Sequence, residues 1–322
     1  MVTLKKIIFV LYIMTCSFML LSCTANEQKV LKLGTVVWVG YEPLYLGREK
    51  GFIDSNEIKL VEFLSASQVL RAFKNNLIDV AALTIDEVMI LLDEGFDASI
   101  FLVVDVSNGA DVIIANKKFN SLKELKGRRI GYENTALGAY ILSRALKMNG
   151  LTSRDVELID MDVNETESAL INNKVDGVVT FEPARSRLLE QGYKEVFSSR
   201  EIPDEVVDVL VVRKEKLQQY KPVLKKLING WFKSVEYMAA NKKESLDIMN
   251  KRLGLSESAI INAFSGVKFP SKEENRMFLN KDINSSKLKK SIEQISKEMI
   301  QMKLINGEAE IDRLISHEIL TQ

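Results

Sequence analysis

Aromatic and acidic side chains recur at the points where apolar runs of this sequence end. Trp38 and Tyr41 follow one such run, Asp86 follows a second, and Phe181 and Glu182 end a third. Aromatic rings can stack on a flat molecule or on a cation, and carboxylates accept hydrogen bonds from nitrogen. These residue types therefore favour the binding of a small nitrogen-bearing molecule.

Three criteria select the candidate site: a position at the carboxyl end of a predicted strand, a position at a helix start, and a side chain suited to binding. The predicted ligand-binding residues are Trp38, Tyr41, Glu42, Ser65, Thr84, Asp86, Glu133, Thr135, Gly138, Phe181 and Glu182. Other roles stay open for several of them. Trp38 could pack the hinge, Ser65 and Asp86 could cap helices, and acids at helix starts are favoured by the helix dipole. Asp105 and Asn108 lie near the first predicted chain crossing and could serve the hinge, and Asp208 lies near the return crossing.

The charge of the predicted site limits its ligand. Small residues in segment 133–138 would let backbone N–H groups face a ligand, an arrangement suited to anions. However, the four predicted acids Glu42, Asp86, Glu133 and Glu182 have no Lys or Arg beside them in the candidate set. A site for a sulfonate or nitrate ordinarily uses Arg, Lys or several N–H donors. We therefore expect a neutral or cationic, nitrogen-bearing ligand.

The sequence shows none of the common catalytic or cofactor patterns. It has no Ser/His/Asp set, phosphate loop, zinc-ligand spacing or dinucleotide-binding glycine pattern, and its single histidine is His317. Basic and acidic residues number 44 each, so no basic excess suggests nucleic acid. We predict a protein that is not an enzyme and has no cofactor, no metal site and no nucleic-acid partner.

An internal echo indicates how the site is built. Residues 75–84 (NNLIDVAALT) are similar to residues 172–181 (NNKVDGVVTF). Both copies read as a helix end with paired asparagines, a turn with Asp, and a small-residue strand. One supersecondary unit used twice predicts two α/β lobes of similar plan, and open α/β sheets bind ligands at the carboxyl ends of their strands.

Alternating short apolar runs and helical patterns predict an α/β fold. The expected strands are 31–37, 57–63, 80–84, 99–106, 111–115, 129–132, 156–160, 175–180 and 206–212, and the expected helices between them are 42–50, 67–76, 86–94, 136–149, 165–173 and 183–191. Beyond residue 212 the chain is nearly all helical. The apolar stripe at 288–302 predicts a helix docked on its own core rather than a coiled coil.

A chain of 322 residues is long enough for two domains. We expect lobe one to comprise residues 31–110 plus 210–322, and lobe two to comprise residues 111–209. The chain would then cross between the lobes twice, which makes a natural hinge.

The amino-terminal segment predicts export. Lys5 and Lys6 precede an apolar run at 7–21, and Leu-Leu-Ser before Cys23 resembles a bacterial lipobox. We expect a lipoprotein signal peptide at 1–22, lipidation of Cys23 and a tether at 23–30. The alternative is an ordinary secretory signal with an incidental cysteine. The expected location is the bacterial cell envelope, lipid-anchored outside the cytoplasm and facing the periplasm in a Gram-negative cell.

Two segments resemble a known family. Residues 38–52 (WVGYEPLYLGREKGF) and 121–131 (SLKELKGRRIG) are similar to the solute-binding proteins of ABC importers for nitrate, sulfonates, taurine and thiamine-pyrimidine precursors. The resemblance implies a two-lobed, type II-like periplasmic-binding-protein fold with a two-crossing hinge and a helical C-terminal tail. It also implies a monomer that closes on a solute and delivers it to an ABC permease.

The resemblance leaves the ligand open. A pyrimidine-like thiamine precursor or an amine fits the predicted acids better than a sulfonate or taurine does. Two further alternatives are a ligand-sensing partner of a membrane receptor and a pyrimidine synthase-like enzyme. The enzyme is disfavoured because that branch of the family uses its own histidine and a cysteine-rich loop. In this sequence His317 lies near the end and Cys23 is the only cysteine after residue 22.

Overall fold

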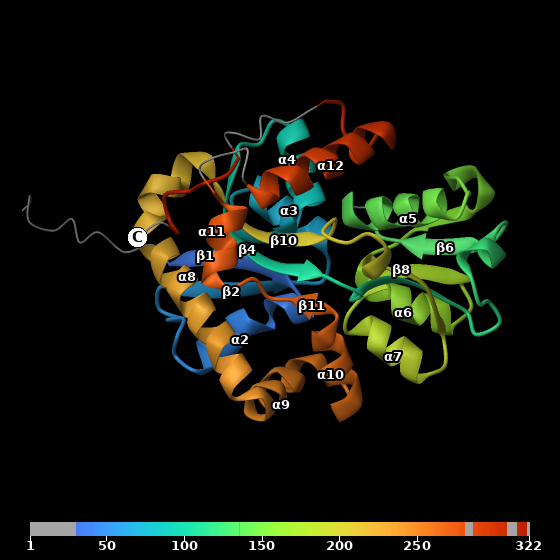
Figure 1. Ribbon diagram of the computed structural model, residues 1–322, viewed down its shortest axis with the longest axis horizontal. Helices are drawn as coiled ribbons and strands as arrows, with labels where there is room; N and C mark the ends of the chain where they lie inside the picture. Colours follow the sequence, from blue (N-terminus) through green and yellow to red (C-terminus); the bar gives the residue numbers. More distant parts are fainter. Residues whose placement is uncertain (1–29, 135, 281–285, 308–313, 321–322) are drawn as a thin grey trace, which may run out of the picture. The chain divides into compact units, whose positions relative to one another are not determined.

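A computed structural model describes residues 30–134, 136–280, 286–307 and 314–320 (Figure 1). The predicted signal peptide, the lipidated Cys23, most of the tether and the candidate Thr135 lie outside the described residues. Within the described part of the chain, no helix is long and apolar enough to cross a membrane.

The first sheet has six strands in the order β11-β4-β10-β3-β1-β2. β1 runs parallel to β2 and β3, whereas β10 is antiparallel to both of its neighbours, β3 and β4. Every residue of β3, β4 and β10 is buried, as expected for strands covered on both faces. The strands are β1 (Leu31–Val36), β2 (Ile58–Phe63), β3 (Val80–Thr84), β4 (Ala98–Ser107), β10 (Val207–Arg213) and β11 (Val267–Lys268).

Helices cover both faces of this sheet. Figure 1 shows α3, α4 and α12 on one side, and α2, α8 and α9 on the other. Trp231 of α8 and Phe73 of α3 are fully buried in the resulting core. The helices are α2 (Glu42–Glu49), α3 (Ala66–Lys74), α4 (Ile85–Asp93), α8 (Leu217–Ala240), α9 (Lys242–Leu253), α10 (Glu257–Ser265), α11 (Lys272–Phe278) and α12 (Lys287–Gln301).

The second sheet has five strands in the order β7-β6-β8-β5-β9. β6 is parallel to β7 and β8, and β5 is antiparallel to β8 and β9. Figure 1 shows α5 on one face and α6 and α7 on the other. The elements are β5 (Asp111–Ala115), β6 (Arg129–Tyr132), α5 (Ala136–Met148), β7 (Glu157–Asp160), α6 (Val163–Ile171), β8 (Gly177–Phe181), α7 (Ala184–Glu190) and β9 (Lys194–Ser198). Two mixed sheets with helices on their faces confirm the predicted α/β class.

The sequence echo corresponds to a repeated structural unit. Asn76 and Asn173 both adopt a left-handed backbone, with φ of 59° and 55°, which asparagine tolerates better than most residues. The carboxylate of Asp79 accepts the Lys32 N–H at the start of β1, at 2.9 Å. Asp176 accepts the Arg129 N–H at the start of β6, at 3.2 Å. In both copies the aspartate therefore joins the first residues of two parallel strands.

Two short strands were not predicted, β9 and β11. Most of β9 is charged or only partly buried, and β11 has only two residues. The stripe at 288–302 is confirmed as a helix packed on the core, because Leu288, Ile292, Ile295 and Met299 of α12 are fully buried.

The chain passes between the sheets twice, after β4 and before β10. Ser107 and Ser199 join these crossings through a hydroxyl–hydroxyl hydrogen bond of 2.8 Å, and the Gly109 N–H donates to Ser199 Oγ at 2.6 Å. Gly109 has a φ of +110°, which only glycine adopts readily. The two crossings are therefore held side by side by hydrogen bonds.

Glu205, on the second crossing, accepts hydrogen bonds from side chains of two helices. It accepts from Tyr140 Oη at 2.6 Å, from Arg144 Nε and Nη2 at 2.7 Å each, and from Gln294 Nε2 at 3.0 Å. Glu205 is only 4% exposed, so these contacts are shielded from water. The crossing is thereby attached to both α5 and α12.

Replacing Glu205 with Ala should lower the free energy of unfolding by about 3 kcal/mol, because Arg144 would lose its buried carboxylate partner. Urea unfolding measures this loss. The matched control is Glu318→Ala, which removes an exposed partner of Lys221 and should leave stability unchanged within error. Equal effects of the two substitutions would contradict a structural role for the Glu205 contacts.

Candidate functional site

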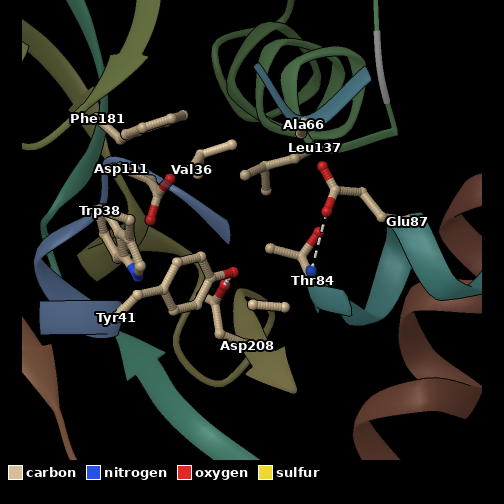
Figure 2. A pocket seen from close by; sticks show the side chains of 11 residues that line it. Val36, Trp38, Tyr41, Ala66, Thr84, Glu87, Asp111, Leu137, Phe181 and Asp208 are labelled. Atoms are coloured by element: carbon tan, nitrogen blue, oxygen red, sulfur yellow. Dashed lines mark hydrogen bonds between the residues drawn. The ribbon is translucent and has the colours of Figure 1, made fainter. Parts of the chain in front are cut away.

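A cavity lies where strand ends of the two sheets meet (Figure 2). Its empty volume is about 360 Å³, including space open to solvent. The first sheet contributes residues from β1, β3 and β10, and the second contributes residues from β5 and β8. The lining residues are Val36, Trp38, Tyr41, Ala66, Ala82, Thr84, Glu87, Asp111, Leu137, Phe181 and Asp208.

A second cavity, of about 330 Å³, adjoins the first and shares five of its residues. The shared residues are Ala66, Glu87, Asp111, Leu137 and Phe181, and the second cavity adds Glu133, Gly138, Ile141, Val163, Val179 and Thr180. Gly138 is needed for close packing, because a Cβ there would lie 2.1 Å from the Glu133 carbonyl oxygen.

Aromatic side chains form one wall of the first cavity. The rings of Trp38 and Phe181 meet edge to face, with centroids 5.5 Å apart and an interplanar angle of 85°. Trp38 Nε1 donates to Asp105 Oδ2 at 3.2 Å, and the Tyr41 hydroxyl donates to Asp208 Oδ1. These hydrogen bonds fix the orientation of two aromatic rings beside buried carboxylates.

The charged residues of the lining are all acidic. Glu87, Asp111 and Asp208 line the first cavity, and none of its described lining residues is Lys, Arg or His. Burial raises the pKa of Asp111 to about 8, against a lowering contribution from the Ser107 hydroxyl. Burial also raises the pKa of Asp208 to about 6 and that of Glu87 well above its ordinary value. A nearby cation would favour the ionised form of all three.

Most of these acids already accept hydrogen bonds from the protein. Glu87 Oε2 accepts the Thr84 N–H at 3.0 Å. Glu133 Oε1 accepts from the Ser67 N–H at 3.0 Å and from its hydroxyl at 2.8 Å. By contrast, Asp111 Oδ2 is buried and has no partner within the described chain. Buried polar atoms are usually hydrogen-bonded, so this oxygen is suited to a donor on a ligand.

The structure brings six of the eleven predicted residues to the cavities. Trp38, Tyr41, Thr84 and Phe181 line the first cavity, while Glu133 and Gly138 line the second. Ser65 is buried at the start of α3 beside Ala66, but neither cavity reaches it. Asp86 is 1% exposed and also does not line either cavity.

Glu42 and Glu182 are occupied elsewhere. Glu42 Oε1 accepts from Arg252 Nε at 3.1 Å, and Glu182 accepts from Arg185 Nη1 at 2.9 Å and from the Ser186 N–H at 3.1 Å. Burial raises the pKa of Glu42 to about 7, although Arg252 opposes this shift. Neither residue lines the described cavities, and both carboxylates accept hydrogen bonds from the protein.

Three cavity acids were missing from the predicted set: Glu87, Asp111 and Asp208. Asp111 is the first residue of β5 and pairs with Phe181, the last residue of β8. Asp208 pairs in the same antiparallel sense with Thr84, the last residue of β3. The prediction rested on the carboxyl ends of strands, whereas an antiparallel strand brings its amino end to the same end of the sheet. Both residues become candidates once the directions of β5 and β10 are known.

No group of three or more His, Cys, Asp or Glu in the described chain is arranged to hold a metal ion.

The Asp111 carboxyl should make stability depend on pH. Its pKa is about 8 in the folded chain and 3.8 ordinarily, so its contribution to stability is full below pH 3.8 and is lost as pH rises through 8. At pH 9, Asp111→Asn should be more stable than the unaltered protein by roughly 1–3 kcal/mol. At pH 5.5 the difference should be smaller. Urea unfolding of ligand-free protein at both values measures this, and parallel pH profiles would contradict it.

Comparisons with known proteins agree with this architecture. The chain matches the NMT1-like family over residues 24–254. A candidate binding protein of Brucella abortus is 26% identical over 180 residues, which are 54% of this chain and 56% of that protein. The chain thus spans about half the length of that curated relative.

Solved structures show the same fold. The alkanesulfonate-binding protein SsuA of Xanthomonas axonopodis pv. citri, bound to MOPS, superposes with a TM-score of 0.74 at 15% identity, covering 89% of this chain and 97% of that one. The desulfurization enzyme DSZB superposes with a TM-score of 0.65 at 17% identity, covering 90% and 97%. The two-lobed fold predicted from residues 38–52 and 121–131 is confirmed. Because the family match extends over most of the chain, this protein belongs to the NMT1-like family.

Proposed function

We propose that this protein is the solute-binding component of an ABC importer and takes a neutral or cationic, nitrogen-bearing small molecule. The observation that carries the proposal is the cavity itself, where strand ends of two lobes present aromatic rings and carboxylates together. Its position follows the general rule for ligand sites in open α/β sheets. The binding protein among its relatives and the shared fold support the role.

The chemistry of the lining supports the ligand class. Glu87, Asp111 and Asp208 offer acceptors to N–H groups, while a sulfonate beside them would meet like charge in a buried setting. Trp38 and Phe181 offer apolar surface to a flat ring. A pyrimidine-like molecule with an amino group, such as a thiamine precursor, or an amine fits these features. A sulfonate or taurine remains the alternative, because a structural relative is an alkanesulfonate-binding protein.

An enzymatic role is the less favoured alternative, although DSZB shows that the fold can carry catalysis. The described cavities are lined by neither His nor Cys. His317 Nδ1 contacts the Leu279 carbonyl oxygen instead. We therefore propose binding without chemistry, and a monomer as the working unit.

Calorimetry can test the ligand class directly. The panel would contain methanesulfonate, nitrate, taurine, primary amines and aminopyrimidines, and mass spectrometry would identify any molecule that co-purifies. We expect micromolar binding by an amine or an aminopyrimidine and none by methanesulfonate or nitrate. Micromolar taurine binding with no response to amines or heterocycles would overturn the proposed class.

The aromatic wall provides a test by mutation. Phe181→Ala should weaken binding of the best panel ligand by about tenfold, because it removes a ring that contacts the cavity. The matched control is Phe264→Ala, since Phe264 is also half-buried but packs on Phe269 away from the cavities. Equal affinities of these two variants would contradict the placement of the site.

The sequence also supports a proposal about location. We expect the mature chain to begin with a lipidated Cys23 and to be held at a membrane surface outside the cytoplasm. Cells fed labelled palmitate should label the protein, and Cys23→Ala should abolish the label. An unlabelled protein whose mature chain begins at another residue would favour the ordinary secretory signal.

Delivery to a permease and delivery to a sensory receptor both require a binding protein that closes on its ligand. Neighbouring genes separate these roles. Adjacent permease and ATPase genes support import, whereas an adjacent signalling receptor gene supports sensing.

A further inference from the structure

We propose that Asp111 is the residue that recognises a cationic nitrogen of the ligand, and that it sets the preference of this site for cations. This inference rests on the proposed function and assigns its specificity to one side chain. It follows from hydrogen bonding, position and charge at the cavity.

The hydrogen bonds of the lining acids single out Asp111. Glu87 Oε2 is taken by the backbone of Thr84, and Asp208 Oδ1 is taken by the Tyr41 hydroxyl. Asp111 is only 2% exposed, and its Oδ2 atom has no partner within the described residues. Leaving a buried acceptor unpaired is costly, so this oxygen is suited to a donor that the ligand brings.

The position of Asp111 suits a flat cation. Figure 2 shows its carboxylate beside the side chain of Phe181, with which Asp111 pairs between strands, and Trp38 packs edge to face on the same Phe181 ring. Cations are attracted to aromatic faces as well as to carboxylates, so one bound group could satisfy both. Asp111 also lines both cavities, and a nitrogen near it would therefore be accessible from either.

The backbone of Asp111 is held in place by hydrogen bonds. Asp111 N–H donates to Ser107 Oγ at 3.3 Å, and β5 is paired on both sides, with β8 and β9. A site built on a paired strand is positioned more precisely than one on a loop, which favours affinity.

The carboxylates around Asp111 also favour a cationic ligand. Asp208 on β10, Asp86 on α4 and Glu182 beside β8 all raise the pKa of Asp111, after burial, which has the largest effect. A cationic ligand would reduce this repulsion, whereas a neutral ligand of the same shape would not.

Benzamidine and benzamide form a suitable probe pair, because they are similar in shape but only benzamidine is a cation. The unaltered protein should bind benzamidine at least about tenfold more tightly than benzamide, in keeping with a charged hydrogen bond. In Asp111→Asn and Asp111→Ser this preference should disappear, while benzamide affinity stays within about threefold. Calorimetry measures both affinities, and urea unfolding confirms that the variants are folded.

The matched control is Glu42→Gln, which removes the charge of another buried acid that does not line the cavities and is not among the charges that raise the pKa of Asp111. It should keep the preference for benzamidine. If the Asp111 variants also keep it, the inference fails while the proposed ligand class stands. If the unaltered protein binds neither benzamidine nor any amine or aminopyrimidine of the panel, the ligand class fails and the inference fails with it.

Discussion

Antiparallel pairing of one strand in each sheet places the acids at the cavity. β5 enters its sheet against the direction of β8, so Asp111 lies opposite Phe181. β10 enters the other sheet against β3, so Asp208 lies opposite Thr84. In each sheet, the last residue of one strand therefore lies beside one of the first residues of its antiparallel neighbour, at the end of the sheet that faces the cavity. A purely parallel arrangement would place both aspartates at the opposite edge, far from Trp38 and Tyr41.

This arrangement concentrates buried acids at a cost to the stability of the empty protein. Burial is the largest cause of the raised pKa values of Glu87, Asp111 and Asp208. Asp208 is partly compensated by the Tyr41 hydroxyl, but Asp111 Oδ2 has no such compensation in the described structure. Buried polar groups that the fold leaves without a partner are typical of functional sites, where a ligand can supply the missing hydrogen-bond donor. The rest of the fold, including the buried Glu205 contacts, offsets the cost.

Sequence patterns predicted the fold well because periodicity and turn chemistry are local. The echo at 75–84 and 172–181 identified two units, since in each unit an Asn adopts the left-handed turn and an Asp accepts a hydrogen bond from a strand N–H.

The site was predicted only in part, because its chemistry depends on residues that are distant in the sequence. Arg252, which pairs with Glu42, is 210 residues away. Strand direction, which brings Asp111 to the cavity, depends on the whole topology.

The same two crossings that carry these aspartates also join the lobes. Asp111 follows Gly109 closely, and Asp208 follows soon after Glu205, so both acids lie beside hydrogen-bonded crossing segments. Ser67, in the first turn of α3, donates its N–H and its hydroxyl to Glu133 Oε1, and Glu133 follows β6 of the second sheet. The halves of the structure built on the two sheets are therefore joined both at the crossings and at this contact.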